Sequence, residues 1–427
     1  MSIAKEASPN APAESSRVSQ YWQEQFEKNR ADRSLWTNNV LVMQHLYRLI
    51  SGGSPEHWLF WFLNHYVPGG LAFERSLSVC CGDGAHELIL ANSGSVEFIR
   101  GFDLSAGAIA QAKAAFVASG IPEQTYRFEV ADADDLHIDD HFDFILSTGA
   151  LHHVNQLQTL LERLSRMLDP DGYFVALEYV GPNRFQWRDP QLNIVNDILR
   201  RLDPRYLKDN RLVEVERPPL AQFLAIDPSE AVHSEEVLRL LGENFTIEYL
   251  SNFNGTLIHP LYPLLNDRFT NANDPGFDGI LKMVLLMEDL LIRHRILSSD
   301  FVFAICRNKM MSAQAPSKPK RRTRRFFGHL DTFDEIKIAG WAVDLSDPTA
   351  QIVADLYLDD QFHATVCCDT LRPDLVEAGY GDGSKSFELP LTLPEKVQPA
   401  VVKMVLAGSD KVLATRRYGR AGVPPAS

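Results

Sequence analysis

Two glycines and two acids in the first quarter of the chain have the residue types and spacing of a nucleotide-binding site. An apolar run that ends at Cys80 breaks into Gly82-Asp83-Gly84, and Asp103 follows about 20 residues later. Glycines leave backbone N–H groups bare, so a ligand can approach them closely. A carboxylate at that spacing can accept hydrogen bonds from ribose hydroxyls in a βαβ unit. These residues predict that the chain binds a nucleotide-type ligand.

Further polar residues follow the next apolar segments. Within the segment YRFEVADADDL (126–136), a predicted strand ends on Asp132, and Ala133 follows it. His152 and His153 follow the apolar run FDFILS. Carboxylate and imidazole groups can bind ligands or exchange protons near neutral pH. The sequence therefore predicts titratable side chains at the ends of several successive elements.

The elements that carry these residues have an alternating strand and helix pattern. One strand is predicted to begin at Leu77. Further strands are predicted at 97–103, 126–132, 142–147, 173–180, 245–250 and 301–306, and a turn at Asp169-Pro170-Asp171-Gly172 precedes the strand at 173–180. The Ala-rich stretch from Leu104-Ser105 to Ala118 is predicted to be a helix. In an open α/β sheet, ligands bind at the carboxyl ends of the strands. We therefore expect the glycine turn, the acids and the histidines to meet at one edge.

In this order the motifs resemble those of class I S-adenosylmethionine-dependent methyltransferases. The resemblance rests on Cys80 to Gly84, Asp103, Asp132-Ala133 with Leu136, and FDFILSTGALHHV. It implies an α/β fold with a doubly wound, seven-stranded Rossmann-like sheet whose seventh strand is antiparallel. It also implies S-adenosylmethionine as the cofactor. The methyltransferase domain is predicted to span 17–308, including N-terminal helices that contain Tyr21-Trp22 and Trp36 to Ile50.

The resemblance also implies which residues touch the cofactor. Gly82 and Gly84 would approach its methionine part, Asp103 would bind the ribose, and Asp132 with the Ala133 amide would read the adenine edge. The full expected set is Cys80, Gly82, Asp83, Gly84, Asp103, Leu104, Asp132, Ala133 and Ser147.

A dehydrogenase is the alternative for the glycine turn, because NAD sites also combine glycines with a later acid. The turn here is Cys-Gly-Asp-Gly rather than G-x-G-x-x-G, and the Leu-His-His motif has no role in hydride transfer. The turn also departs from the usual methyltransferase pattern of three small positions, since His86 follows Ala85. The ordered set of motifs favours the methyltransferase.

Methyl transfer requires an aligned acceptor and, for a hydroxyl, removal of its proton. His152 and His153 are candidate bases, supported by Glu178 at the end of the fifth strand. In the competing interpretation the histidines only hold the loop, and Glu178 caps a helix or forms a salt bridge. The expected substrate-binding residues are Tyr179, Asn183, Arg184, His233 and His259. Ser234 is expected to be a structural helix cap. No metal-ligand spacing is found, although Asp227 and Glu230 could bind Mg²⁺.

Two long insertions interrupt the last strands of the predicted sheet. One spans 181–232 with a helix near 191–202, and the other spans 255–298 with a helix near 278–296. Late insertions in a doubly wound fold lie over the carboxyl ends of the strands. We expect them to form the roof of the substrate pocket.

The composition is that of a soluble enzyme. The chain has 427 residues, 45% of them hydrophobic, and a formal net charge of −14, which argues against general nucleic-acid binding. No apolar run reaches the roughly 18 residues of a transmembrane helix. Residues 1–16 are expected to be a disordered tail without a signal peptide, so the predicted location is cytoplasmic. Four of the five cysteines form adjacent pairs, which indicates neither disulfides nor zinc.

A basic segment, expected to be a linker at 309–327, marks a domain boundary. It could contact phosphorylated or lipid-linked substrates or an anionic membrane surface, or it could be a solvated connection. The region 328–420 is predicted to be a small antiparallel β-sandwich with strands at 336–343, 354–358, 363–367, 385–389 and 401–406.

The C-terminal region resembles accessory β-domains of glycan-modifying enzymes. The resemblance rests on Gly340-Trp341-Ala342, Asp359-Asp360, Arg372 to Leu375, and Gly381-Asp382-Gly383 through Phe387. Trp341 would be a carbohydrate platform or a buried core residue.

Together these features predict an O-methyltransferase that acts on a sugar hydroxyl of a bacterial polysaccharide or glycolipid precursor. The alternative is a small-molecule or protein methyltransferase whose β-domain mediates partner assembly. A third reading is a cofactor-binding scaffold without activity. A homo-oligomer is compatible with each of them.

Overall fold

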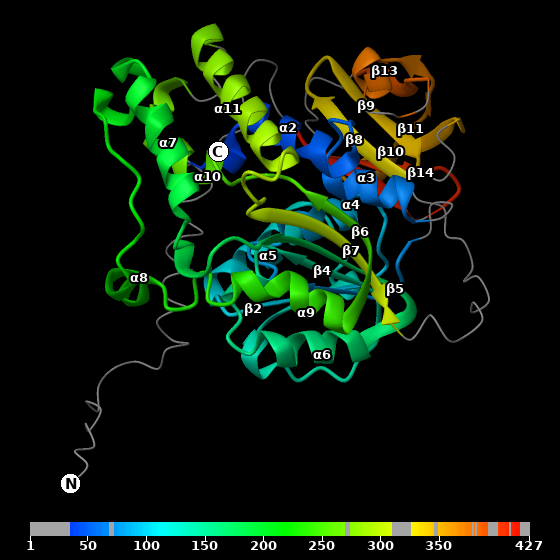
Figure 1. Cartoon of the computed structure of the whole chain (residues 1–427). Coiled ribbons are helices and arrows are strands. Elements are labelled where there is room, and N and C mark those ends of the chain that lie inside the picture. Colours follow the sequence, from blue (N-terminus) through cyan, green and yellow to red (C-terminus); the bar gives the residue numbers. More distant parts are fainter. Residues whose placement is uncertain are drawn as a thin grey trace.

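A seven-stranded sheet with one reversed strand forms the centre of the computed structural model (Figure 1). Its strands are β1 (Ser76–Val79), β2 (Ile99–Asp103), β3 (Tyr126–Val130), β4 (Phe142–Thr148), β5 (Leu168–Tyr179), β6 (Phe245–Asn252) and β7 (Phe301–Asn308). Their order is β3-β2-β1-β4-β5-β7-β6, and β7 is antiparallel to β5 and β6. The predicted doubly wound sheet is confirmed.

The structure describes most of the chain. The described residues are 35–67, 72–269, 274–309, 326–345, 349–377, 380, 382–391, 400–409 and 411–418. The predicted tail at 1–16, Tyr21-Trp22, linker residues 310–325 and Gly381 lie outside them.

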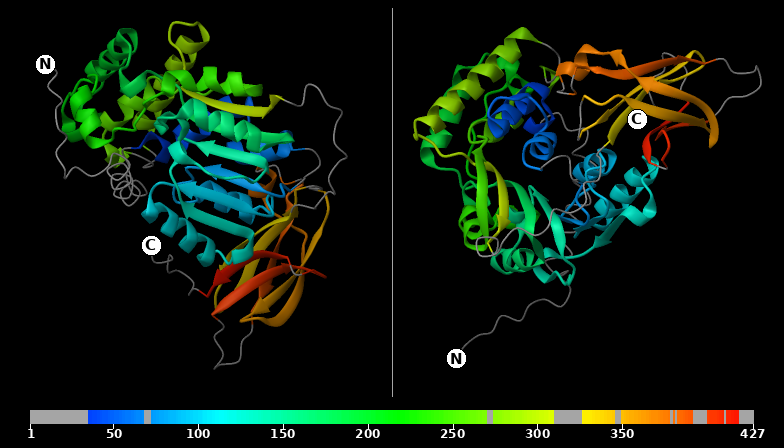
Figure 2. Two further views of the ribbon diagram at one scale, coloured as in Figure 1. Left: turned by 90° about the horizontal axis from the view of Figure 1, so that it is seen from below. Right: turned by 90° about the vertical axis from the view of Figure 1, so that its right-hand side faces the viewer.

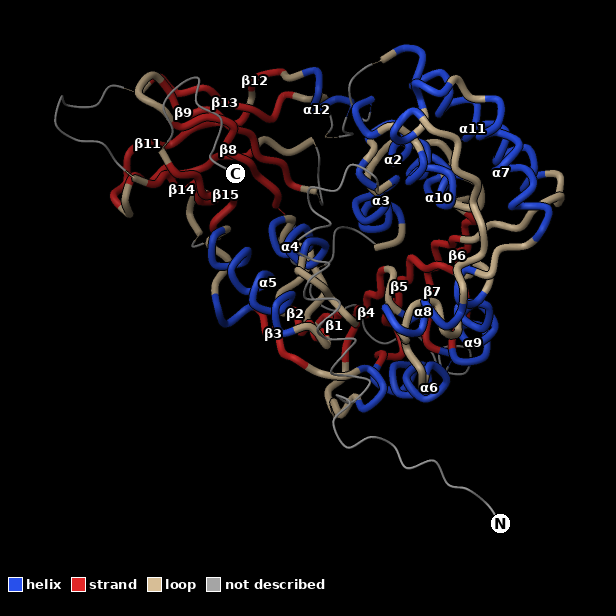
Figure 3. Tube along the Cα trace, turned by 90° about the vertical axis from the view of Figure 1, so that its left-hand side faces the viewer, coloured by secondary structure: helices blue, strands red, loops and turns tan. Residues whose placement is uncertain are grey.

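Helices cover both faces of the sheet. They are α2 (Val40–Ser51), α3 (Trp58–His65), α4 (Ala85–Asn92), α5 (Ala106–Ala118), α6 (Leu157–Met167), α7 (Asp189–Arg201), α8 (Leu220–Ile226), α9 (Val237–Asn244), α10 (Ile258–Leu261) and α11 (Pro275–Arg293). On one face, Leu161 of α6 and Leu241 of α9 join Phe174 of β5 in an apolar cluster. On the other face, Leu90 of α4 and Phe116 of α5 belong to a second cluster, which also includes α2 and α3. Figure 3 shows α6 and α9 on the side of the sheet opposite α4 and α5.

The helices begin where the sequence supplies caps. Ser105 accepts a hydrogen bond from the Ala108 N–H at the start of α5, and alanines then favour the helix. Asp274 caps α11 in the same way through the Phe277 N–H, and proline occupies the first helical position. These caps fix where the helices leave the sheet edge.

The parallel register brings the candidate residues to one edge of the sheet. Val79, the last residue of β1, pairs with Phe102 on one side and with Ser147 on the other. Thr148 at the end of β4 pairs with Leu177 of β5. The loops after these strands therefore converge above the middle of the sheet.

Two predicted boundaries were wrong. The residues predicted as a turn, Asp169 to Gly172, lie within β5. There the ladder is irregular, because Phe142 pairs with Leu168 while Phe144 pairs with Tyr173. The extra residues bulge from the ladder, and the Arg307 guanidinium donates to two of their carbonyls.

The third strand also ends earlier than predicted, at Val130. Asp132 instead caps a short 3₁₀ helix, Ala133–Asp135, by accepting the Asp134 N–H. Its carboxylate thus accepts a hydrogen bond from the backbone where the chain turns away from the sheet.

The two insertions carry helices α7, α8, α10 and α11. α7 and α8 come from 181–232, and α10 and α11 come from 255–298. Gln191 of α7 donates to the Thr256 carbonyl and to the Asp300 carboxylate, which ties the insertions to each other and to the start of β7. Among the described residues, no helix is long and apolar enough to cross a membrane.

Two four-stranded antiparallel sheets form the β-domain at the C-terminal end. One has the order β11-β10-β14-β15 and the other β12-β13-β9-β8. Their elements are β8 (Phe326–Phe333), β9 (Lys337–Asp344), β10 (Ile352–Leu358), β11 (Gln361–Cys368), β12 (Thr370–Leu371), α12 (Pro373–Glu377), β13 (Ser384–Pro390), β14 (Val401–Leu406) and β15 (Val412–Arg417).

Sequence patterns missed β8, β12 and β15. The first of these begins inside the expected linker, at Phe326. Trp341 is 9% exposed and packs against Phe327 and Tyr380, so it is a core residue of this domain.

The β-domain lies beside α3 and α4 (Figure 2). Phe60 of α3 and Phe327 of β8 pack with ring centroids 5.8 Å apart. Lys411 lies over the Phe326 ring and against the backbone of Gly94, at the end of α4. Burial lowers the pKa of Lys411, while the charges of Asp344 and Glu97 oppose this shift.

Candidate active site

The loop after β1 presents bare backbone to a cavity. Cys80, Gly82 and Gly84 have φ angles of +50°, +55° and +75°, so the chain turns sharply before α4. A Cβ on Gly84 would lie 2.9 Å from the Ala112 Cβ. Gly84 therefore permits the close packing of α4 on α5, and it lies outside the cavity lining.

The cysteines of this loop are free thiols. Burial, with nearby carboxylates, raises the pKa of the Cys80 and Cys81 thiols well above the usual value. They therefore line the cavity as small, neutral groups.

Asp103 holds the loop and the next helix together. Its Oδ2 accepts the Gly82 N–H over 3.0 Å, and its Oδ1 accepts the Ser105 N–H over 2.8 Å. The side chain is nearly buried, and this burial raises its pKa. Each oxygen keeps a lone pair that can accept a further hydrogen bond.

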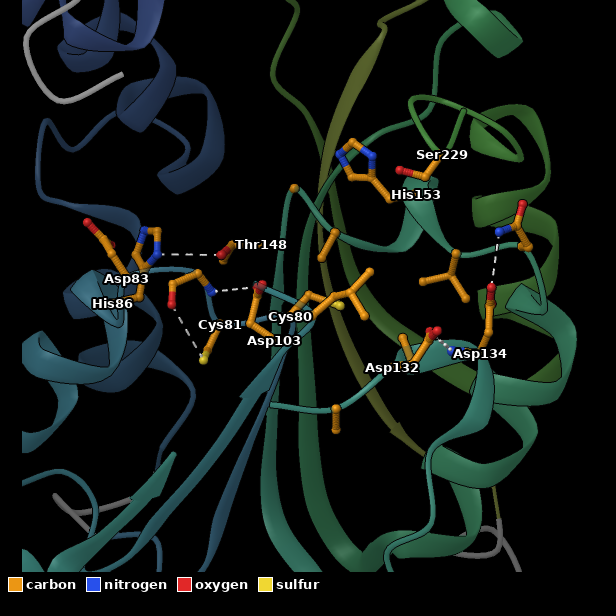
Figure 4. A pocket seen from close by; sticks show the side chains of 18 of the residues that line it. Cys80, Cys81, Asp83, His86, Asp103, Asp132, Asp134, Thr148, His153 and Ser229 are labelled. Atoms are coloured by element: carbon orange, nitrogen blue, oxygen red, sulfur yellow. Dashed lines mark hydrogen bonds between the residues drawn. The ribbon is translucent and has the colours of Figure 1, made fainter. Parts of the chain in front are cut away.

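These residues surround a cavity of about 510 Å³, within the range of small-molecule sites. Its lining consists of Cys80, Cys81, Gly82, Asp83, Ala85, His86, Asp103, Leu104, Ala131, Asp132, Ala133, Asp134, Thr148, Gly149, Ala150, His153, Val154, Asn155 and Ser229. Four of these described residues are aspartates, and none is lysine or arginine. Figure 4 shows His153 and Ser229 together, apart from Asp83 and His86.

Glu178 organises the wall of the cavity that His153 lines. Its carboxylate is fully buried at the end of β5. Oε1 accepts hydrogen bonds from the Ser147 hydroxyl and from the Ala150 and Leu151 N–H groups, each over 3.0 Å. Oε2 lies 2.9 Å from His152 Nδ1. The Ser147 hydroxyl thus donates to Glu178, and Ser147 does not line the cavity.

The two histidines differ in position and in the direction of their pKa shifts. His153 lines the cavity, whereas His152 lies behind it, between Glu178 and Glu230. Burial lowers the pKa of His152, but the hydrogen bond to Glu178 and the charges of Glu178 and Glu230 outweigh it, so the net shift is upward. Burial and the neighbouring His152 hold the pKa of His153 well below its usual value.

Glu230 comes from the first insertion and faces both imidazoles. Its Oε1 lies 3.6 Å from His152 Nε2 and 3.9 Å from His153 Nε2. Burial raises the pKa of Glu230 to about 7. The first insertion thus places a carboxylate beside the two histidines of the loop after β4.

None of the five predicted substrate-binding residues lies in the cavity lining. The Tyr179 hydroxyl donates to the Pro182 carbonyl, and the Arg184 guanidinium donates to the Pro228 and Glu230 carbonyls. These two side chains stabilise the insertion.

The other three predictions have similar outcomes. The Asn183 side chain accepts from the Ser234 hydroxyl, so Ser234 is structural but does not cap a helix. His233 pairs with Glu236 near the surface. His259 is packed among aromatic rings, and burial lowers its pKa to about 4.

Sequence reasoning missed several cavity residues, namely His86, Thr148, Gly149, Asn155 and Ser229. His86 Nδ1 lies 3.4 Å from the Thr148 hydroxyl, and burial lowers the pKa of this histidine to about 4. The sequence signal for His86 was that it stands in the glycine turn where methyltransferases usually have a small residue. Ser229 lies in an insertion without a recognisable pattern.

Comparisons with known proteins agree with this geometry. Residues 77–176, which include β2 to β4 and most of β1 and β5, match the family described as a methyltransferase domain. This segment therefore holds a methyltransferase domain. The cofactor of this methyltransferase domain is S-adenosylmethionine.

The relatives cover parts of the chain. An uncharacterized methyltransferase of Bacillus subtilis, YcgJ, is 29% identical over 135 residues, which are 31% of this chain and 51% of that protein. The chain thus spans about half the length of this curated relative. A crystal structure of an S-adenosylmethionine-dependent methyltransferase from Mesorhizobium loti is 19% identical, with a TM-score of 0.35, over 58% of this chain and 97% of that one. A geranyl diphosphate methyltransferase structure with S-adenosylmethionine is 13% identical, with a TM-score of 0.38, over 58% and 83%.

The residues of the methyltransferase domain fit the cofactor. The cavity offers unsubstituted backbone at Gly82 and lone pairs on Asp103 and Asp132, which suit hydroxyl and amino groups. Its aspartates also suit a ligand that carries a sulfonium charge. The donors and the volume of the site are those that a nucleoside ligand requires.

Proposed function

We propose that the chain is an S-adenosylmethionine-dependent O-methyltransferase that acts on a sugar hydroxyl of a polysaccharide or glycolipid precursor. One observation carries the proposal. A single cavity joins the cofactor motifs at Gly82, Asp103 and Asp132 to His153, which is backed by a buried imidazole and carboxylate cluster. Donor and acceptor can therefore meet in one cavity.

The donor side of the cavity would orient the cofactor. Asp103 would accept hydrogen bonds from the ribose, Asp132 and Ala133 would meet the adenine, and Gly82 would lie against the methionine part. When bound, the cofactor supplies a methyl group on a positively charged sulfur, open to displacement. Gly84 and Ser147 would act indirectly, through helix packing and through Glu178.

On the acceptor side, His152, His153 and Glu178 would activate the hydroxyl, together with Glu230. The acceptor oxygen would take the methyl group that the bound cofactor supplies, and the electron pair of the broken carbon–sulfur bond would stay on sulfur. The hydroxyl proton passes to the imidazole and carboxylate cluster. Glu178 holds His152 in place, which limits the freedom of the cluster during the reaction.

A neutral, hydroxyl-rich acceptor fits the rest of the lining. Thr148, Asn155 and Ser229 can exchange hydrogen bonds with several hydroxyl groups. An anionic acceptor would face four aspartates without a lysine or arginine in the described lining. The proposal includes the cytoplasmic location and the glycan-linked role of the β-domain expected from the sequence.

The test is transfer of a labelled methyl group. The full chain is incubated with methyl-labelled S-adenosylmethionine and, separately, with neutral glycans, lipid-linked sugars, small phenols and protein. Label in a sugar fraction that is lost in the Asp103→Ala variant supports the proposal. Label confined to phenols or protein, or no transfer to any acceptor, overturns it.

A further inference from the structure

His152, His153 and Glu230 form a group with the geometry of metal ligands. One ligand atom from each, the two imidazole nitrogens and a carboxylate oxygen, lies within 4.8 Å of the others. The Glu230 Oε1 distances of 3.6 Å and 3.9 Å to the two imidazoles are longer than hydrogen bonds. Atoms bound at about 2.1 Å to one cation lie roughly 3–4 Å from each other. The spacing thus leaves room for an ion between them.

The surroundings of this group carry excess negative charge. Glu178, Asp227 and Glu230 bring three carboxylates into a buried region. Asp227 Oδ1 accepts from Ser229, but its buried Oδ2 has no hydrogen-bond partner. Arg184, whose guanidinium donates to the Pro228 and Glu230 carbonyls, brings one positive charge close to Glu230, against these three carboxylates. Buried carboxylates are stable when a cation is close.

One imidazole is already oriented as metal-bound histidines usually are. His152 Nδ1 lies 2.9 Å from Glu178 Oε2, so Nε2 is directed toward Glu230. A carboxylate behind a histidine fixes its ring orientation and strengthens it as a ligand. Glu178 is in turn fixed by two backbone N–H groups and a hydroxyl. The support for a metal ligand is therefore present without the metal.

We propose that His152, His153 and Glu230 bind a divalent first-row transition metal ion, such as Mn²⁺ or Zn²⁺. Two imidazoles and one carboxylate are ligands of this class of metal. Three protein ligands leave coordination positions open, and His153 places the group at the cavity wall. An acceptor hydroxyl oxygen would take an open position, and because the imidazole nitrogens would then be ligands, the hydroxyl proton would pass to a carboxylate of the cluster. This role rests on the proposed function, whereas binding of the cation does not.

The experiment measures metal binding directly. Tag-free full-length protein is treated with EDTA, dialysed and titrated with MnCl₂ and with ZnCl₂ by calorimetry. We expect one equivalent per chain. The affinity should fall at least 10-fold in Glu230→Gln and in His153→Ala. It should fall about 10- to 100-fold in Glu178→Gln, which removes the orienting charge and replaces one acceptor oxygen by an amide donor. Co²⁺ bound at the same site should give a visible absorption spectrum that these variants lose.

The matched control is His137→Ala. His137 also lies beside a carboxylate, with its Nδ1 3.5 Å from Asp135 Oδ1, but both side chains are exposed. This variant should bind the metal as the unchanged protein does. Unfolding curves and S-adenosylmethionine binding show that each variant is folded.

Two results would overturn the metal proposal: absence of stoichiometric binding, or binding that Glu230→Gln and His153→Ala leave unchanged. Either result leaves S-adenosylmethionine binding and methyl transfer as they are, so the proposed function would stand. Conversely, the protein could bind a metal in a way that depends on Glu230 and yet transfer no methyl group to any hydroxyl. That result would support the metal site and contradict only the binding of an acceptor hydroxyl at the open coordination position.

Discussion

Gly82 donates its backbone N–H to Asp103 Oδ2, which joins the loop after β1 to the end of β2. The other carboxylate oxygen accepts the N–H of Ser105, the cap of α5. One side chain therefore fixes the backbone on both sides of the proposed ribose position. The same carboxylate has to serve the structure and the ligand.

Replacement of Asp103 by alanine should weaken S-adenosylmethionine binding. The variant loses the ligand acceptor and leaves the Gly82 and Ser105 N–H groups without their partner. Loss of hydrogen bonds to a charged group corresponds to roughly 10- to 100-fold in affinity. Calorimetry with S-adenosylmethionine measures the change, and Asp103→Asn is the milder comparison. An unchanged dissociation constant in both variants would contradict the assignment.

Glu178→Ala should destabilise the domain more than Glu178→Gln. Alanine leaves the Ala150 and Leu151 N–H groups and the Ser147 hydroxyl without an acceptor in a buried region. We expect a loss of roughly 3–5 kcal/mol for alanine. Glutamine keeps an acceptor oxygen and should lose clearly less. Urea unfolding at neutral pH measures both, and equal losses would be inconsistent with this network.

Two glycines with positive φ should respond differently to alanine. At Gly84 the new Cβ would meet the Ala112 Cβ at 2.9 Å, so α4 and α5 must separate. At Gly149, where φ is +61°, no heavy atom lies within 4 Å of a Cβ. Gly149→Ala should therefore cost only the backbone strain, about 1–2 kcal/mol, and Gly84→Ala should cost more. Thermal unfolding compares them, and the opposite order would refute the packing argument.

Glu288 should make the fold less stable as the pH rises. It lies buried in α11 and accepts the Leu257 and Ile258 N–H groups. Burial, with the charges of Asp300 and Asp289, raises the pKa of Glu288 to about 8. The folded state then holds a proton that the unfolded chain releases above about pH 4.5. The contribution is present at low pH and is lost as the pH rises toward 8.

The test of this pH dependence compares the chain with Glu288→Gln. One carboxyl group changes the slope of unfolding free energy by at most ~1.4 kcal/mol per pH unit. We expect the decline in stability between pH 5 and pH 8 to be shallower in the variant, as measured by urea unfolding at several pH values. Identical slopes would show that Glu288 does not titrate in this range.

The donor side of the site could be predicted from the sequence because local signals place it. The ends of β1 and β2 place the glycine turn and Asp103, and the register of the parallel strands then brings them to one edge. The third strand ends earlier than predicted because the Asp132 side chain caps the following 3₁₀ helix instead of continuing the strand. Competition of this kind between a cap and a strand changes where the strand ends, but Asp132 still lies beside the cavity.

The acceptor side could not be predicted, because its contacts depend on how the insertions pack. Arginine is a residue type that can bind sugar hydroxyls, yet the Arg184 guanidinium donates hydrogen bonds to backbone carbonyls of its own insertion. His259 is enclosed by aromatic rings from distant segments. Glu230 lies close to the histidines only because of the tertiary fold, and no residue spacing in the sequence predicts this proximity.

The origin of the proposed acceptor wall limits how this site could be re-engineered. Glu230 and Ser229 belong to the insertion at 181–232, whereas His152 and His153 belong to the loop after β4. A graft of the insertion onto another sheet would carry over the carboxylate but leave both imidazoles behind. Transplanting acceptor recognition would therefore need the two segments together, while the residues of the donor half could stay as they are in the recipient.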